Sequence, residues 1–334
     1  MAARIDFPTQ AAIDEAVAVL RAGGLIGLPT ETVYGLAGDA ANPAAVAAIF
    51  AAKGRPNDHP VIVHVAPGAD LSRWAARVPD DARRLIDAWW PGPLTLILPR
   101  AQGVDDAVTG GQDTVGLRCP SHPVAQAVLA AFGGGVAAPS ANRFGRVSPT
   151  TAQHVAGEFG DAVPLVLDGG ACEVGIESTI VDVSGDAPVL LRPGHIAAAD
   201  LARTLGRPVL TRAQAEALRA TPRVSGALAA HYAPRTPLEL VAAEALPARL
   251  AAARAAGQAV GAWSRRDPGG AARWLAAPAE PEAYAHQLYA ALRALDGHGL
   301  DLLLVEAPPD GERWAGVRDR LGRAAVGSGP GTPV

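Results

Sequence analysis

The chain has 334 residues, is 49% hydrophobic and carries a net charge of −4, a size typical of about two domains with sizeable cores. Residues 1–205 hold 14 basic and 21 acidic side chains, and residues 206–334 hold 15 and 12. Neither part has the strong positive charge of a sequence-independent nucleic-acid binder, and no run of eighteen apolar residues is present to cross a membrane.

Residues 1–206 alternate helical and strand patterns. Caps and apolar spacing predict helices over 9–24, 42–54, 121–133 and 195–206, with Asn42, Pro43 and Gly54 at the ends of the second. Short apolar runs predict strands at 25–29, 61–65, 94–98, 114–118, 163–168 and 178–183. We therefore expect a catalytic α/β domain over 1–206 with a twisted, mixed sheet.

Residues 207–237 change character, because after a short helical piece the chain contains three prolines and no clean period. We interpret this segment as a linker. Strand and helix patterns then alternate again over 238–334, which predicts a smaller three-layer, Rossmann-like α/β domain.

The two cysteines, Cys119 and Cys172, lack any metal-ligand spacing, and the segment MAARIDFPTQ lacks the apolar core of a secretory signal. We therefore expect a cytoplasmic protein with reduced, buried thiols.

Six polar turns interrupt the apolar pattern, and together they offer hydroxyls, cations and imidazoles, which suit phosphates and a carboxylate. They are PTETVYGLAGD (29–39), KGRPNDHPVIVHV (53–65), TVGLRCPSHP (114–123), PSANRFGRVSPT (139–150), GIESTIVD (175–182) and LLRPGH (190–195). Each has a structural alternative. Ser140, Asn142 and Ser148 could cap a helix that begins near Thr150, and His64 could be a core or edge histidine.

Lys53 is the only lysine among 29 basic residues. Arginine replaces lysine easily on a surface but poorly where a compact ammonium is needed, so Lys53 indicates a specific site. The alternative is that a surface lysine has survived by chance. No P-loop, GxGxxG after a strand, nucleophile elbow or zinc motif is present. The sequence therefore predicts a phosphate site outside the common nucleotide folds.

Five of these motifs, PTETVYGL, KGRP…HP…VH, SAN.FG.VSPT, ESTIVD and LRPG, occur in the order found in the YrdC-like family of threonylcarbamoyl-AMP synthases. The resemblance spans roughly residues 10–205, and HYAP at 231–234 with the α/β tail resembles the long, two-domain form. It implies a reaction in which L-threonine, bicarbonate and ATP give L-threonylcarbamoyl-AMP and pyrophosphate. A separate transferase complex would then modify the tRNA adenosine beside the anticodon.

The resemblance also implies roles for residues at matching positions. Lys53 and Arg55 would act on the phosphates in catalysis. The threonine site would comprise Thr32, His64, Arg118, Ala138 and Ser178, and the ATP site Arg55, His59, Thr114, Ser140, Ser148, Arg192 and Tyr232. His59 departs from the asparagine of many relatives. We expect Mg²⁺ to be bound mainly through ATP phosphates, with protein metal ligands unidentified. Glu31, Glu177 and Asp182 lie close enough in the motifs to contact the water ligands of the metal, but we commit none of them to that role.

Three alternatives remain open. An RNA-binding protein of the same fold is disfavoured by the −7 charge of residues 1–205, which also argues against tight direct tRNA binding. A carbamoyl-transfer enzyme of metal-centre maturation would carry zinc-finger and acylphosphatase modules, which this chain lacks. A catalytically silent scaffold would not need the intact motif set.

Overall fold

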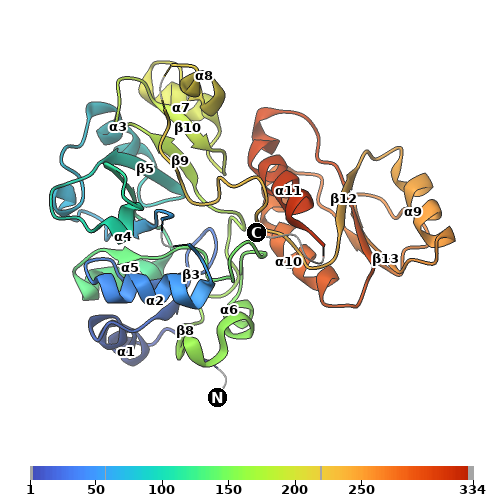
Figure 1. Cartoon of the computed structure of the whole chain (residues 1–334), viewed down its shortest axis with the longest axis horizontal. Coiled ribbons are helices and arrows are strands. Elements are labelled where there is room, and N and C mark those ends of the chain that lie inside the picture. Colours follow the sequence, from blue (N-terminus) through green and yellow to red (C-terminus); the bar gives the residue numbers. More distant parts are fainter. Residues whose placement is uncertain (1–2, 57, 219, 330–334) are drawn as a thin grey trace. The chain divides into compact units, whose positions relative to one another are not determined.

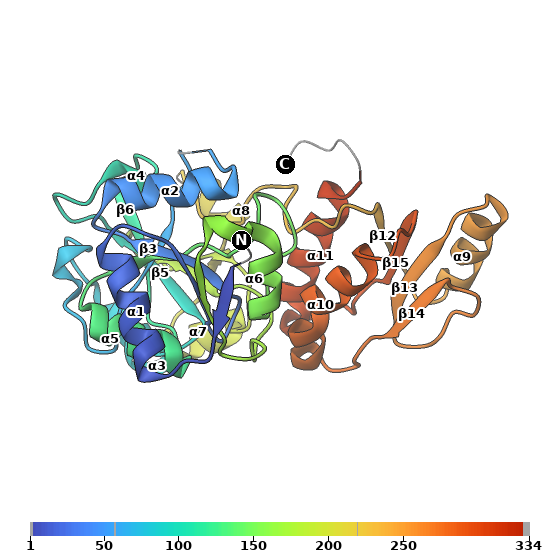
Figure 2. The same ribbon diagram turned by 90° about the horizontal axis from the view of Figure 1, so that it is seen from below.

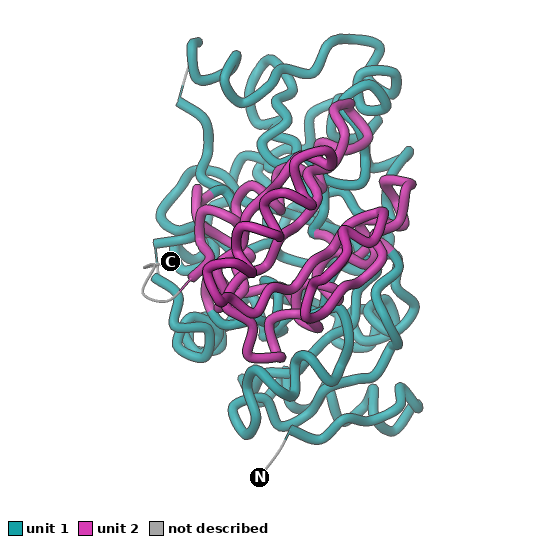
Figure 3. The backbone as a smooth tube through the Cα atoms, turned by 90° about the vertical axis from the view of Figure 1, so that its right-hand side faces the viewer, with its two compact units in different colours: residues 1–143, 149–173, 177–227 teal, residues 144–148, 174–176, 228–334 magenta. Residues whose placement is uncertain are grey.

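The computed structural model describes residues 3–56, 58–218 and 220–329. The chain forms two compact units (Figure 3): unit 1 comprises residues 1–143, 149–173 and 177–227, and unit 2 comprises residues 144–148, 174–176 and 228–334. The domain boundaries at 206 and 238 remain predictions. None of the helices among the described residues is long and apolar enough to cross a membrane.

Unit 1 is built on one mixed, 11-stranded sheet of described residues (Figure 1). In spatial order its strands are β1 (Arg4–Asp6), β8 (Leu165–Leu167), β2 (Ile26–Leu28), β3 (Gly35–Asp39), β7 (Val136–Ala137), β4 (Ile62–His64), β6 (Thr114–Arg118), β5 (Leu94–Pro99), β9 (Thr179–Asp182), β10 (Val189–Arg192) and β11 (Leu210–Thr211). The sheet contains both parallel pairs such as β4–β6 and antiparallel pairs such as β5–β6, as predicted for a mixed sheet.

Helices cover both faces of this sheet. One face packs against α2 (Pro43–Lys53), α3 (Asp80–Trp89), α6 (Ala152–Phe159) and α7 (Ala198–Leu205). The opposite face packs against α1 (Gln10–Arg21) and α5 (Pro123–Phe132) over β2, β8 and β7, and against α8 (Arg212–Glu216) over β9 and β10. In Figure 1, α8 lies at the end of unit 1 opposite α1 and α5. This face therefore has two apolar patches with a stretch of sheet between them.

The helix caps follow the sequence closely. The side chain of Asn42 caps α2, Pro43 opens the helix, and Gly54 ends it with φ = 64°, as predicted. The interpretation of Ser140, Asn142 and Ser148 as caps is wrong, because Thr151 caps α6 by accepting a hydrogen bond from the backbone N–H of His154. The sequence pattern also missed α3, a helix that buries only Ala82 and Leu85.

Unit 2 is a three-layer α/β structure (Figure 2). Its described strands are all parallel, in the order β12 (Leu238–Val241), β15 (Leu302–Glu306), β13 (Val260–Ser264) and β14 (Arg273–Ala276). One face packs against α9 (Leu246–Ala255), and the other packs against α10 (Pro281–Asp296) and α11 (Ala315–Gly327). The predicted Rossmann-like class of this part of the chain is confirmed.

Candidate active site

A row of polar side chains crosses the face of the unit 1 sheet between its two apolar patches. The strand register pairs His64 with Arg118 and Arg118 with Thr95. The neighbours that end the row are Val136, in the patch under α1 and α5, and Ile180, in the patch under α8. Since paired residues point to the same face, non-local strand pairing assembles this row from three strands.

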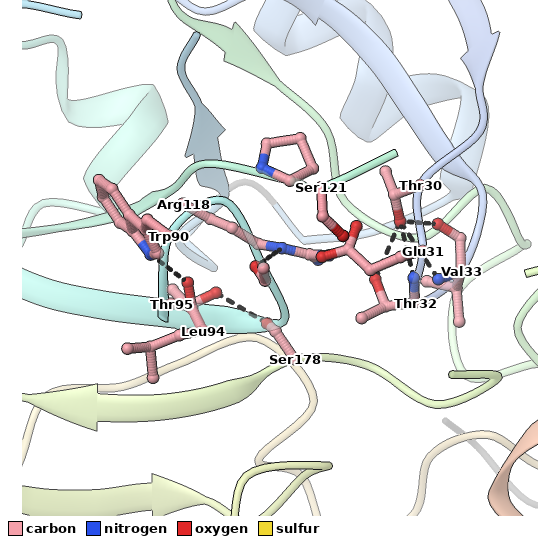
Figure 4. Close-up of polar contacts among 12 residues, drawn as sticks. Thr30, Glu31, Thr32, Val33, Trp90, Leu94, Thr95, Arg118, Ser121 and Ser178 are labelled. Carbon is pink, nitrogen blue, oxygen red and sulfur yellow. Dashed lines mark hydrogen bonds and ion pairs between the residues drawn. The ribbon is translucent and has the colours of Figure 1, made fainter. Parts of the chain in front are cut away.

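Arg118 lies at the centre of the row and is 4% exposed. Its Nη2 atom lies 2.8 Å from Oε1 of Glu31, whose side chain is also buried (Figure 4). Glu31 belongs to the turn of the PTETV segment, which the hydroxyl of Thr30 closes by donating a 2.6 Å hydrogen bond to the carbonyl of Val33. The turn therefore holds a carboxylate against the cation that was predicted to bind threonine.

Two predicted ligands meet on the other side of the row. The hydroxyl of Ser178 lies 2.7 Å from that of Thr95, and the guanidinium of Arg192 donates to the Ser178 carbonyl at 2.9 and 3.0 Å and to its hydroxyl at 3.1 Å. Ser178, predicted to bind threonine, and Arg192, predicted to bind ATP, are therefore direct neighbours.

A narrow cleft with apolar walls continues along the sheet from the row. Its lining includes Ile62, Gly116, Ile97 and Ile180 from four adjacent strands, together with Thr114, Pro60 and the 223–225 segment. Gly116 leaves space at the floor of the cleft, because it has no side chain. A Cβ atom at this position would lie 3.3 Å from Cδ1 of Ile97. The cleft therefore lies on the same face of the sheet as the polar row.

The 223–225 segment is held to this cleft by two predicted ATP ligands. Arg55 donates to the Ser225 hydroxyl at 3.3 Å and to the carbonyl of Pro60 at 2.9 Å, and Arg192 donates to the Ser225 carbonyl at 2.8 Å. Both guanidinium groups are buried. The predicted linker thus contributes directly to the cleft.

Lys53 ends α2 and is 3% exposed. Its Nζ donates to the carbonyls of Ser140 and Asn142 at 2.5 and 2.6 Å. Burial lowers the pKa of Lys53 well below its usual value, and Arg55 lowers it further. The structure therefore places Lys53 as an anchor of the 140–142 turn, while its action on phosphates stays a prediction.

The two predicted histidines differ in their surroundings. His64 is buried in an interior strand, and burial together with Arg118 lowers its pKa to about 3, so the imidazole is neutral near pH 7. His59 is partly exposed, and burial followed by Arg55 lowers its pKa also.

The remaining predicted residues divide between the units. In unit 1, the hydroxyl of Thr32 lies 2.9 Å from that of Thr30, and the N–H of Ala138 donates to the carbonyl of Ile62 at 3.2 Å. Ser148 and Tyr232 belong to unit 2.

Tyr232 is 1% exposed in unit 2 and has a left-handed φ of 61°. The guanidinium of Arg320 lies 5.3 Å from its ring centre, and the ring of Tyr289 lies 5.8 Å away. The predicted ATP contacts of Tyr232 and Ser148 remain predictions.

Sequence reasoning committed Glu31 to no role and missed two further residues of this candidate site, Thr95 and Ser225. Thr95 carried a weak signal, since it is the one hydroxyl in the strand LTLIL. Ser225 carried none, because its partners are more than thirty residues away along the chain.

Two family models match the chain in succession. One, described as telomere recombination, matches residues 18–194, and one, described as the threonylcarbamoyl-AMP synthase C-terminal domain, matches residues 196–326. The threonylcarbamoyl-AMP synthase of Bacillus subtilis strain 168 is 37% identical over 325 residues, which cover 94% of this chain and 93% of the relative. The Pyrococcus abyssi enzyme of the same name is 35% identical over 316 residues, which cover 93% of each.

A crystal structure of P. abyssi Sua5 complexed with L-threonine superposes on this chain with a TM-score of 0.89, at 34% identity and 96% coverage of both chains. The fold and the site define a two-domain α/β enzyme with a mixed sheet, in which the arginines of the candidate site, Arg55, Arg118 and Arg192, are buried. The chain belongs to the threonylcarbamoyl-AMP synthase family, which confirms the resemblance carried by its motifs.

Proposed function

We propose that the chain is a nucleotidyltransferase that makes L-threonylcarbamoyl-AMP from L-threonine, bicarbonate and ATP and releases pyrophosphate. The observation that carries the proposal is the continuity of the polar row His64–Arg118–Thr95 with a cleft bordered by Arg55 and Arg192. In this proposal the polar row binds the amino acid, and the cleft binds the nucleotide.

In the proposed threonine half, Arg118 pairs with the carboxylate of the substrate, because a buried guanidinium offers several donors in a fixed plane. The neutral His64 and the hydroxyls of Thr32 and Ser178 contact its polar groups, and Ala138 borders the site. The P. abyssi relative solved with L-threonine supports threonine as the substrate.

In the proposed nucleotide half, the flat purine ring enters the cleft over Gly116, beside Thr114. Arg55 and Arg192 exchange their bonds with Ser225 for bonds to phosphate oxygens. Lys53, His59 and Ser140 approach the phosphates from the neighbouring turns, and the nucleotide contacts of Ser148 and Tyr232 stay predictions from the family resemblance.

The chemistry needs no nucleophile from the protein. The ammonium of threonine first loses a proton to solvent. The free amine nitrogen then bonds to the carbon of CO₂ and releases a second proton, or it bonds to the carbon of bicarbonate as water leaves, and either route gives a carbamate. A carbamate oxygen then bonds to the α-phosphorus, and the bond from that phosphorus to pyrophosphate breaks, with the electron pair leaving on pyrophosphate. The cations position the reactants and neutralise their negative charge, which are the two main sources of rate in such transfers.

Within the described residues, no three or more His, Cys, Asp or Glu side chains gather as a metal site. Mg²⁺ is therefore proposed to arrive on the ATP phosphates with water as its other ligand, as is usual for this ion, and there it would shield phosphate charge. We further propose that the product passes to a tRNA threonylcarbamoyl transferase complex, and that this chain binds tRNA weakly or not at all by itself.

The test is pyrophosphate release from ATP with threonine, bicarbonate and Mg²⁺ omitted in turn, together with mass detection of the adenylate. Release that requires all three supports the proposal. Release that persists without threonine or without bicarbonate would contradict it. An Arg118→Ala variant serves as the control, because it should lose threonine-dependent release.

A further inference from the structure

Glu31 is a buried acidic side chain for which the proposed reaction so far has no use. It is 3% exposed, and its Oε1 atom contacts Nη2 of Arg118 at 2.8 Å. Neither of its carboxylate oxygens accepts a hydrogen bond from the described residues. Figure 4 shows the carboxylate between the PTETV turn and Arg118, with Ser121 beside it.

A buried carboxylate without hydrogen bonds is costly, since two charged oxygens have left water for a single ion pair. Buried acceptors are normally satisfied, and an exception calls for a partner that binds them. Apart from the Arg118 guanidinium in that ion pair, the described neighbours of Glu31 supply no such donor. A ligand that carries N–H groups and a positive charge would.

The ion pair between Arg118 and Glu31 also limits what that ligand can be. An α-amino acid carries its ammonium and its carboxylate on the same carbon, so both charges must be met within a few ångströms. Arg118 and Glu31 offer a cation and an anion 2.8 Å apart in one buried spot. A zwitterion can therefore pair each of its charges with the opposite charge of the site, and the net charge of the site does not change.

We propose that Glu31 binds the α-ammonium group of L-threonine while Arg118 binds its carboxylate. This inference rests on the proposed function, in which Arg118 receives the substrate carboxylate. The contact orients the nitrogen on the sheet face, and it makes the site discriminate against acids that lack an α-amine.

The test compares two ligands in two proteins. One ligand is L-threonine, and the other is 2,3-dihydroxybutanoate with matching stereochemistry, which keeps the carboxylate and the side-chain hydroxyl but replaces the ammonium with a neutral hydroxyl. Their dissociation constants are measured by titration calorimetry on the full chain and on its Glu31→Gln variant. Loss of a buried charge-assisted contact is expected to weaken threonine binding about 10- to 100-fold and to leave the analogue within about threefold of wild type.

Two further variants separate recognition from folding. Asp182→Asn alters another buried carboxylate, which accepts bonds from the N–H and hydroxyl of Ser184 at 2.9 and 2.6 Å, and it should keep the wild-type preference for threonine. Glu31→Asp keeps the charge and should retain part of the preference if the glutamine variant fails to fold.

The outcomes are distinct. If Glu31→Gln keeps the wild-type preference for threonine over the analogue, the role of Glu31 is overturned while the proposed function stands. The same conclusion follows if Glu31→Asp folds but loses that preference completely. Wild-type protein that binds neither ligand and releases no pyrophosphate overturns both proposals.

Discussion

Lys53 offers the sharpest test of how the site is built. Its Nζ donates two short hydrogen bonds to the carbonyls of Ser140 and Asn142, and its pKa is lowered by burial and by Arg55. A neutral amine still has two N–H groups, so the side chain can keep both bonds after it loses its proton. Arginine cannot do this, since its guanidinium stays charged in proteins.

The size of the effect follows from the two carbonyls. Lys53→Met removes both donors, and each buried acceptor left without a partner costs about 1–3 kcal/mol. Methionine also escapes the cost of burying an amine, which offsets part of that loss. We expect a net loss of about 1–4 kcal/mol in the free energy of unfolding, and a loss at least as large for Lys53→Arg, which buries a permanent charge.

The assays are urea unfolding and pyrophosphate release. Arg21→Met is the matched control, because Arg21 also ends a helix and donates to one backbone carbonyl, that of Ala131, but is exposed; its loss should be much smaller. A Lys53→Met midpoint equal to that of the wild type refutes the anchoring role. Wild-type stability and turnover in Lys53→Arg would refute the need for an amine.

Two further perturbations test other parts of the site. The pKa of His64 is lowered to about 3 from its usual 6.5. Between these two pH values the unfolded chain binds a proton that the folded chain does not. The free energy of unfolding should therefore fall as the pH drops from 6.5 toward 3, by up to about 1.4 kcal/mol per pH unit. The urea midpoints at pH 7.5 and pH 5 should differ less in His64→Asn than in the wild type. An equal difference in the two proteins would contradict a lowered pKa of His64. Gly116→Val should fill the cleft floor and raise the KM for ATP about tenfold with little change for threonine, and steady-state kinetics would reveal the reverse pattern if the purine ring lies elsewhere.

Local chemistry in the sequence predicted most of the elements that carry the site. The caps of α2 and the short apolar runs of strands β4, β6 and β9 are short-range signals, and the structure has each element within a few residues of its predicted bounds. The motifs predicted which turns carry polar groups.

The arrangement of those groups could not be predicted, because it depends on strand order and register. His64 and Arg118 become neighbours only when β4 pairs in parallel with β6, and Thr95 joins them only when β5 pairs with β6 in the opposite direction. A one-residue shift would send any of these side chains to the other face. The partners of Glu31 and Lys53 depend on the same long-range packing.

The acidic charge of residues 1–205 leads to a last prediction, because it opposes the binding of ATP. The opposing carboxylates are mostly on the surface, where ions screen them within about 8 Å at physiological salt. The two arginines assigned to ATP, Arg55 and Arg192, are 8% and 3% exposed and act in a medium of lower dielectric constant. Binding that depended on the overall field would change steeply with salt, whereas binding by buried cations should not. We therefore expect the KM for ATP, at fixed free Mg²⁺, to change by less than about threefold between 50 and 300 mM KCl. A rise of tenfold or more would mean that ATP is held by exposed charges and not by these two arginines.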